Sequence, residues 1–181
     1  RLFTNTGDLI LRADWEPFLT ETRAMWEKVG VHHEVLGLDE VRYRWPQIAA
    51  DGVTVALHEP GAGVARARVA CLTVAEAFRR KGGEIVIARA EPGERSGGRL
   101  GDLALSSGGR LAARTFVFAC GPWLPKVLPD AMADRIRTPL GHVYYYATPP
   151  GDDRFTHPNL PSYNVPGVTG WPCLGFDNRG F

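Results

Sequence analysis

The sequence predicts an α+β fold, built mostly on antiparallel sheet with one helix-then-strand segment typical of a parallel βαβ unit. That segment spans residues 66–88, where a helix over 66–81 ends at a glycine pair and an apolar run follows. Residues 103–112 predict a hairpin, because two short apolar runs flank a Ser-Gly-Gly turn. Residues 116–122 predict a buried strand that stops at a Gly-Pro pair. Such a small-residue turn is where α/β sheets leave room for a ligand.

The first third of the chain predicts short strands and two helices. Residues 1–11 contain two short apolar runs around an Asn-Thr-Gly-Asp turn. We expect a helix capped by Asp14 to follow, with apolar residues at helical spacing up to Gly30. Residues 32–36 predict the next strand, and Asp39 is expected to cap a short helix.

The later elements are strands separated by polar loops. Residues 53–57 alternate between apolar and polar, which predicts a half-buried strand. An aromatic strand is expected at 141–146, where His142 and Tyr144 share one face because side chains alternate along a strand. Residues 149–161 predict a long polar loop.

Composition and charge exclude several classes of protein. Hydrophobic residues make up 44%, charged residues 23%, and the net charge is +1, so no nucleic-acid partner is implied. No apolar run approaches the roughly 18 residues of a membrane span. The three cysteines form no CxxC pair, which predicts neither a disulfide framework nor a zinc site and favours a cytoplasmic protein. No GxSxG hydrolase motif is present.

Several motifs resemble one known family in their order and rough spacing. They are the F-T-x-T-G run near the start, Arg44-Trp45-Pro46, Glu59-Pro60 with Gly63, the helix up to Gly82-Gly83, the G-P-W of 121–123 and Gly170-Trp171-Pro172. Together they resemble the amine-oxidising flavoproteins of the D-amino-acid-oxidase superfamily, in particular monomeric sarcosine oxidase and N-methyltryptophan oxidase.

The resemblance implies a two-domain flavoprotein with a Rossmann-type FAD domain and a mostly antiparallel substrate domain. Residues 63–125 would then be part of the FAD domain, and 1–62 and 126–181 parts of the substrate domain. The family's GxGxxG motif would precede Arg1, and its active-site lysine would follow Phe181. We therefore expect a central fragment of an FAD-dependent oxidoreductase that is inactive alone. The whole protein would oxidise a secondary amine or amino acid by hydride transfer to FAD.

The resemblance also implies cofactor-binding residues. The backbone near Ala90 would lie by the adenine of FAD. The turn of Ala119, Cys120 and Gly121 would pass close to the cofactor, because small residues let backbone N–H groups approach a ligand.

Four residues are candidates for the substrate pocket: His142, Tyr144, Thr169 and Trp171. The last two occupy the family's active-site strand, whereas core packing is an equal alternative for Trp171. Thr169 stands where sarcosine oxidase has a tyrosine, which argues against carrying sarcosine over as the substrate. No residue is assigned a catalytic role, and no metal site is predicted at His33 and Glu34, since adjacent strand residues point to opposite faces.

A second hypothesis remains open. The chain could be a flavin-free binding or interaction domain derived from the same fold. An upstream GxGxxG in the reading frame would favour the flavoprotein. For the fragment, we expect exposed sheet edges to promote oligomerisation.

Overall fold

The computed structural model describes residues 1–175 and 181, and the chain divides into two compact units. Unit 1 comprises Arg1–Val74 and Tyr144–Phe181, and unit 2 comprises Ala75–Val143. Helix α3 (Ala67–Arg80) begins in the first unit and ends in the second. It closely matches the helix predicted at 66–81.

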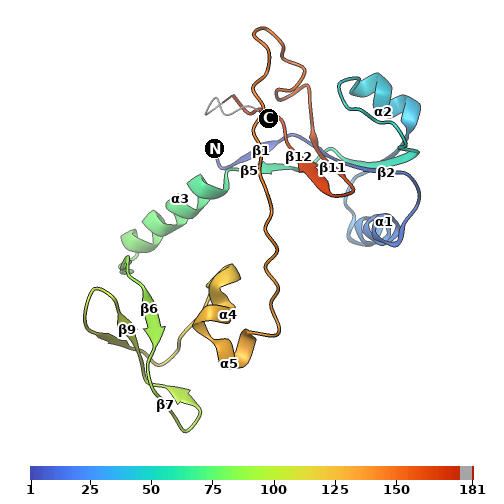
Figure 1. The fold of residues 1–181 in the computed structure, drawn as a ribbon. Coiled ribbons are helices and arrows are strands. Elements are labelled where there is room, and N and C mark those ends of the chain that lie inside the picture. Colours follow the sequence, from blue (N-terminus) through green and yellow to red (C-terminus); the bar gives the residue numbers. More distant parts are fainter. Residues whose placement is uncertain (176–180) are drawn as a thin grey trace. The chain divides into compact units, whose positions relative to one another are not determined.

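Unit 1 is built on a five-stranded mixed sheet (Figure 1). Its order is β12 (Val168–Gly170), β11 (Ser162–Val165), β2 (Asp8–Arg12), β4 (Val55–Glu59) and β3 (Glu34–Gly37). All neighbours are antiparallel except β11 and β2, which run parallel. A separate antiparallel pair joins β1 (Phe3–Asn5) to β5 (Gly63–Ala65).

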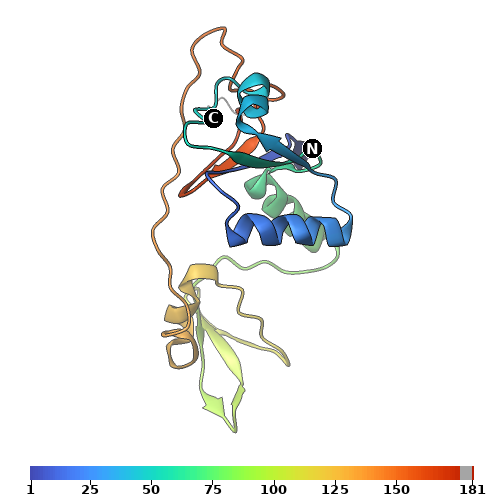
Figure 2. The same ribbon diagram turned by 90° about the vertical axis from the view of Figure 1, so that its right-hand side faces the viewer.

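Helices α1 (Pro17–Val29) and α2 (Leu38–Arg44) cover opposite faces of this sheet (Figure 2). Leu9 and Leu11 pack with Val41 of α2, whereas Ile10 packs with Leu19 of α1. The alternation follows from the two-residue period of a strand. Consecutive apolar residues in β2 are all buried because both faces are covered.

The predicted helix caps are only partly right. Gly30 ends α1 in the left-handed conformation, with φ of 76°, as expected. The N-cap of α1 is Glu16, not Asp14, whose carboxylate instead accepts a hydrogen bond from the Trp15 N–H. Pro17 fits the first helical position and moves the start past Asp14. Asp39 likewise lies inside the first turn of α2 rather than at its cap.

Unit 2 contains short strands and short helices. A three-stranded antiparallel sheet has the order β10 (Arg110–Ala112), β9 (Asp102–Leu105), β6 (Ala90–Pro92), and β7 (Arg95–Ser96) pairs with β8 (Arg99–Leu100). The helices are η1 (Gly121–Trp123), α4 (Leu124–Val127) and α5 (Pro129–Met132). The β9–β10 hairpin confirms the prediction for 103–112, and the α+β class with mostly antiparallel sheet is confirmed.

Two predicted strands of unit 2 are wrong. Residues 84–88 and 116–119 form no strand, and the side chains of Ile87 and Val117 are 89% and 85% exposed. A strand exists only where a neighbour completes its hydrogen bonds. No segment of unit 2, all of which the structure describes, pairs with either run.

The segment after unit 2 is extended. Among the described residues, no strand is assigned to the predicted run 141–146, but Tyr146 exchanges two backbone hydrogen bonds with Phe181 at 3.0 and 3.1 Å. Residues 176–180, which precede Phe181, lie outside the described residues. The long loop predicted at 149–161 is confirmed and makes one isolated bridge, between Thr156 and Cys173.

Candidate functional site

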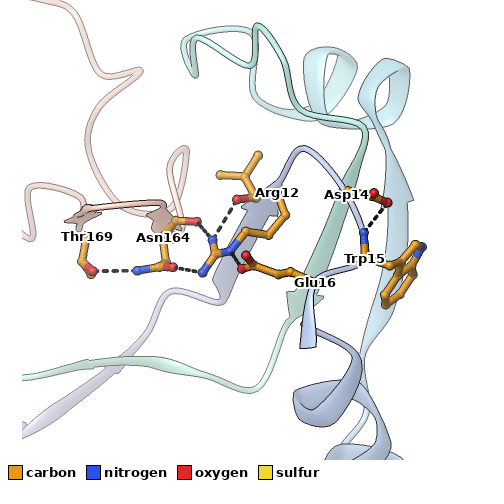
Figure 3. A network of polar contacts seen from close by, with 7 residues as sticks. Arg12, Asp14, Trp15, Glu16, Asn164 and Thr169 are labelled. Atoms are coloured by element: carbon orange, nitrogen blue, oxygen red, sulfur yellow. Dashed lines mark hydrogen bonds and ion pairs between the residues drawn. The ribbon is translucent and has the colours of Figure 1, made fainter. Parts of the chain in front are cut away.

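A buried arginine organises the polar contacts around the predicted pocket residue Thr169 (Figure 3). Arg12 ends β2 and is only 7% exposed. Its Nη1 donates to the Leu11 carbonyl at 2.8 Å and to the Asn164 carbonyl at 3.1 Å. Its Nε pairs with the carboxylate of Glu16, which lies four residues on at the start of α1. Burying a guanidinium is tolerated here because each of its three nitrogens donates at least one hydrogen bond and its charge is paired.

The same arginine reaches Thr169 through Asn164. Arg12 Nη2 donates to Asn164 Oδ1 at 2.7 Å, and Asn164 Nδ2 donates to Thr169 Oγ1 at 2.8 Å. Asn164 and Thr169 are directly opposite each other in the β11–β12 hairpin. Parallel pairing places Asn164 beside Ile10 of β2, so Arg12 lies on the same side of the sheet. The network thus joins three strands.

The sequence did not single out Arg12 or Asn164. The one available signal was an arginine at the end of the apolar run Leu9–Leu11. Pairing across β2, β11 and β12 joins positions about 150 residues apart, and local periodicity does not contain that pairing.

The other predicted pocket residues are distributed over both units. Trp171 directly follows β12 and is half-buried. Tyr144, which is 65% exposed, belongs to unit 1, whereas His142 belongs to unit 2. Grouping all four in one substrate pocket therefore stays a prediction.

A pocket of about 490 Å³ in unit 2 contains the predicted cofactor residue Ala90. The pocket is lined by β6 and the residue before it, and by η1 and α4. The lining residues are Arg89, Ala90, Glu91, Pro92, Trp123, Lys126 and Val127. Ala119, Cys120 and Gly121 precede Trp123 in the chain and do not line this pocket. Gly121 has a φ of 50°, a backbone conformation that favours glycine, and a Cβ atom added there would meet no atom within 4 Å.

The chemistry of the unit 2 pocket suits part of a dinucleotide. Trp123 offers an aromatic ring for stacking, and Arg89 and Lys126 offer positive charge for phosphates. Arg89 also pairs with Glu91 at 2.7 Å. The residues present therefore fit the nucleotide portion of FAD.

A second polar cluster in unit 1, made of Glu34, Arg44 and His58, was also not predicted from the sequence. His58 Nδ1 lies 2.7 Å from Glu34 Oε2, and Arg44 donates to the same oxygen at 2.8 Å. Hydrogen bonds from His58 and then Arg44 hold the pKa of Glu34 below its usual value. His58 and Trp45 line a neighbouring pocket of about 360 Å³. A Cβ atom at Gly7 would lie 3.0 Å from His58 Nε2, so a glycine suits this turn.

Neither a cluster of metal ligands nor a membrane-spanning helix occurs among residues 1–175 and 181. They contain no group of three or more His, Cys, Asp or Glu side chains placed to hold a metal ion. Over the same residues, no helix combines the length and apolarity needed to cross a membrane.

Comparison with known structures gives matches of fold. L-Proline dehydrogenase from P. horikoshii matches with a TM-score of 0.60 and 21% identity, over 74% of this chain and 36% of that protein. Iminodiacetate oxidase from Chelativorans sp. BNC1 matches with a TM-score of 0.61 and 17% identity, over 99% of this chain and 52% of that protein. Glycine oxidase from Bacillus cereus ATCC 14579 matches with a TM-score of 0.55 and 18% identity, over 71% of this chain and 36% of that protein.

The chain thus spans between about a third and a half of the length of these structures. No curated protein matches it. The family model described as FAD dependent oxidoreductase matches residues 2–176, which is nearly the whole chain. The chain belongs to the FAD dependent oxidoreductase family.

Proposed function

We propose that the protein containing this chain oxidises a small secondary amine or amino acid by transferring a hydride to FAD. Family membership supports the flavin, and the names of the similar structures support the substrate class, since proline, glycine and iminodiacetate all carry an amine and a carboxylate. The observation that carries the proposal is the network that holds Thr169 on β12. A relation to sarcosine oxidase in particular is part of this proposal.

One part of the chain would bind the cofactor and the other would bind the substrate. Residues 63–125 would belong to the FAD domain, with Ala90, Ala119, Cys120 and Gly121 near the cofactor. The remaining residues would belong to the substrate domain, with His142, Tyr144, Thr169 and Trp171 at the pocket. FAD, when bound, supplies the hydride acceptor. The side chains of this protein would bind and orient the amine.

We propose further that residues 1–181 alone hold no flavin and are inactive. The unpaired apolar runs at 84–88 and 116–119 support this, because an FAD domain of Rossmann type needs such runs as strands. Exposed edges and apolar side chains would promote oligomerisation. A cytoplasmic location is supported by three cysteines that form no disulfide.

The test uses the protein expressed from its full reading frame. We expect a yellow protein whose flavin absorbance is bleached anaerobically by at least one of sarcosine, glycine, L-proline and iminodiacetate. The same amines added to free FAD serve as the control. A flavin-containing protein that none of a broad panel of amines reduces would contradict the proposed reaction.

The alternative is a flavin-free binding domain derived from the same fold. Purification of the full-length protein without flavin, together with failure to take up added FAD, would favour it. Trp123→Ala adds a direct check, since it should weaken FAD uptake if the unit 2 pocket holds the nucleotide portion.

A further inference from the structure

The contacts of Asn164 fix the orientation of its side-chain amide. A guanidinium can only donate hydrogen bonds, so the Asn164 atom that lies 2.7 Å from Arg12 Nη2 must be the oxygen. The other amide atom, Nδ2, therefore faces Thr169 (Figure 3). Arg12 is itself held by the Leu11 and Asn164 carbonyls, by the carboxylate of Glu16 and by the ring of Phe18, whose centroid lies 5.3 Å from its guanidinium carbon.

This orientation decides the role of the Thr169 hydroxyl. Its oxygen accepts the hydrogen bond from Asn164 Nδ2 at 2.8 Å, which leaves the hydroxyl hydrogen to be donated elsewhere. Thr169 donates that hydrogen to no other group among residues 1–175 and 181, and it is exposed on the edge strand β12.

We propose that Arg12 and Asn164 are positioning residues that hold the Thr169 hydroxyl as a hydrogen-bond donor to an acceptor atom of the substrate. The inference rests on the proposed function, in which Thr169 lines the substrate pocket. Arg12 fixes the orientation of the Asn164 side-chain amide. The Nδ2 of Asn164 then occupies the oxygen of the Thr169 hydroxyl as a donor, so that the hydroxyl hydrogen points away from Asn164. Thr169 itself contacts the substrate.

Asn164→Asp changes the hydrogen-bond direction of the Thr169 hydroxyl without changing the size of the side chain at position 164. The variant keeps the size of the side chain and its contact with Arg12, but it replaces the Nδ2 donor with an acceptor oxygen. The Thr169 hydroxyl would then donate to the new carboxylate rather than to the substrate. Thr169→Val removes the hydroxyl at constant size, and Thr169→Ser retains it.

The experiment measures KM and kcat for the best amine substrate of the full-length flavoprotein. We expect Asn164→Asp and Thr169→Val each to raise KM about tenfold, which is the loss of one hydrogen bond. The double variant should be no worse than either single variant, because both remove the same contact. Thr169→Ser should stay close to the wild-type KM.

Asn159→Asp is the matched control, because Asn159 is an exposed asparagine of the same unit whose amide donates to the Asp153 carbonyl. It should leave KM unchanged. Thermal unfolding of each variant reports whether the fold is retained, and Thr169→Val provides the test if Asn164→Asp unfolds.

The outcomes separate the two proposals. A wild-type enzyme that oxidises amines, with Asn164→Asp or Thr169→Val at the wild-type KM, would overturn the positioning role and leave the proposed function standing. Independent, additive effects of the two variants would also overturn it. A wild-type protein without amine-dependent flavin reduction would overturn both.

Discussion

Unit 1 and unit 2 differ most in what they bury. Among the described residues, every buried hydrophobic side chain, from Leu9 to Leu160, belongs to unit 1, and none of residues 75–143 is fully buried. Unit 1 has a five-stranded sheet with a helix on each face, whereas the largest sheet of unit 2 has three short strands. Both units contain apolar runs of similar composition.

The difference shows that an apolar run becomes a strand only when a neighbour pairs with it. Leu9 and Ile10 pair with both β11 and β4, and Leu11 pairs with β4, and the side chains of all three are buried. Residues 85–87 are as apolar, but unit 2 has no strand beside them. Full burial of apolar side chains and strand pairing therefore occur together in unit 1, whereas residues 84–88 have neither.

Hydrogen exchange should give the largest contrast between the units. Amide protons of β2 and β4 should exchange more than about a thousandfold more slowly than those of 84–88, because opening the core requires most of the unfolding free energy. Exchange measured by mass spectrometry on residues 1–181 provides the test. Protection at 84–88 comparable to that of β2 would show that those residues are paired in solution.

Truncating an apolar side chain should lower the free energy of unfolding much more in unit 1 than in unit 2. Leu11→Ala should lower the free energy of unfolding by about 2–5 kcal/mol, because Leu11 is fully buried. Ile87→Ala should change it by less than about 0.5 kcal/mol, because Ile87 is 89% exposed. Urea unfolding followed by tryptophan fluorescence is suitable, since every tryptophan except Trp123 lies in unit 1. Equal effects would contradict the contrast.

A buried arginine with several polar partners should matter more for stability than an arginine in an exposed ion pair. Arg12→Ala should cost about 1.5–3 kcal/mol of unfolding free energy, because several polar partners lose a charged donor. Arg23→Ala, which breaks an exposed pair with Glu27, is the control and should cost less than about 0.5 kcal/mol. The comparison uses the same urea unfolding, and a smaller loss for Arg12→Ala would argue against its burial.

The smallest expected effect is the pH dependence due to Glu34. Its pKa is lowered in the folded state by His58 and Arg44, so its stabilisation is fully present above its unfolded pKa of about 4.3 and is lost as the pH falls through the folded value. Because the carboxylate is a third exposed, we expect less than about 1 kcal/mol. The stability difference between wild type and Glu34→Gln should shrink as the pH falls from about 6 to about 3. A constant difference would exclude this contribution.

Local signals predicted much of the fold. Helix α3, the C-terminal Gly30 of α1, the β9–β10 hairpin and the strands near 34–37 and 55–59 lie within a few residues of their predicted positions. Local signals placed the caps at Asp14 and Asp39 wrongly, because Pro17 sets the start of α1 after Glu16 and α2 begins directly after Gly37. They also predicted strands at 84–88 and 116–119, where composition alone cannot show whether a partner exists.

The amino-acid sequence was enough to predict the α+β class and the family resemblance, because periodicity, turn residues and motif order can be read along the chain. Ala90 and Thr169 became candidate site residues only through what that resemblance implies. The folded structure was needed to find that Arg12 and Asn164 form a hydrogen-bonded chain to Thr169, and that Ala90 and Trp123 line the same pocket. Those groupings depend on pairing between strands and on packing between segments far apart in the chain. Their energies arise from contacts that no local stretch of sequence contains.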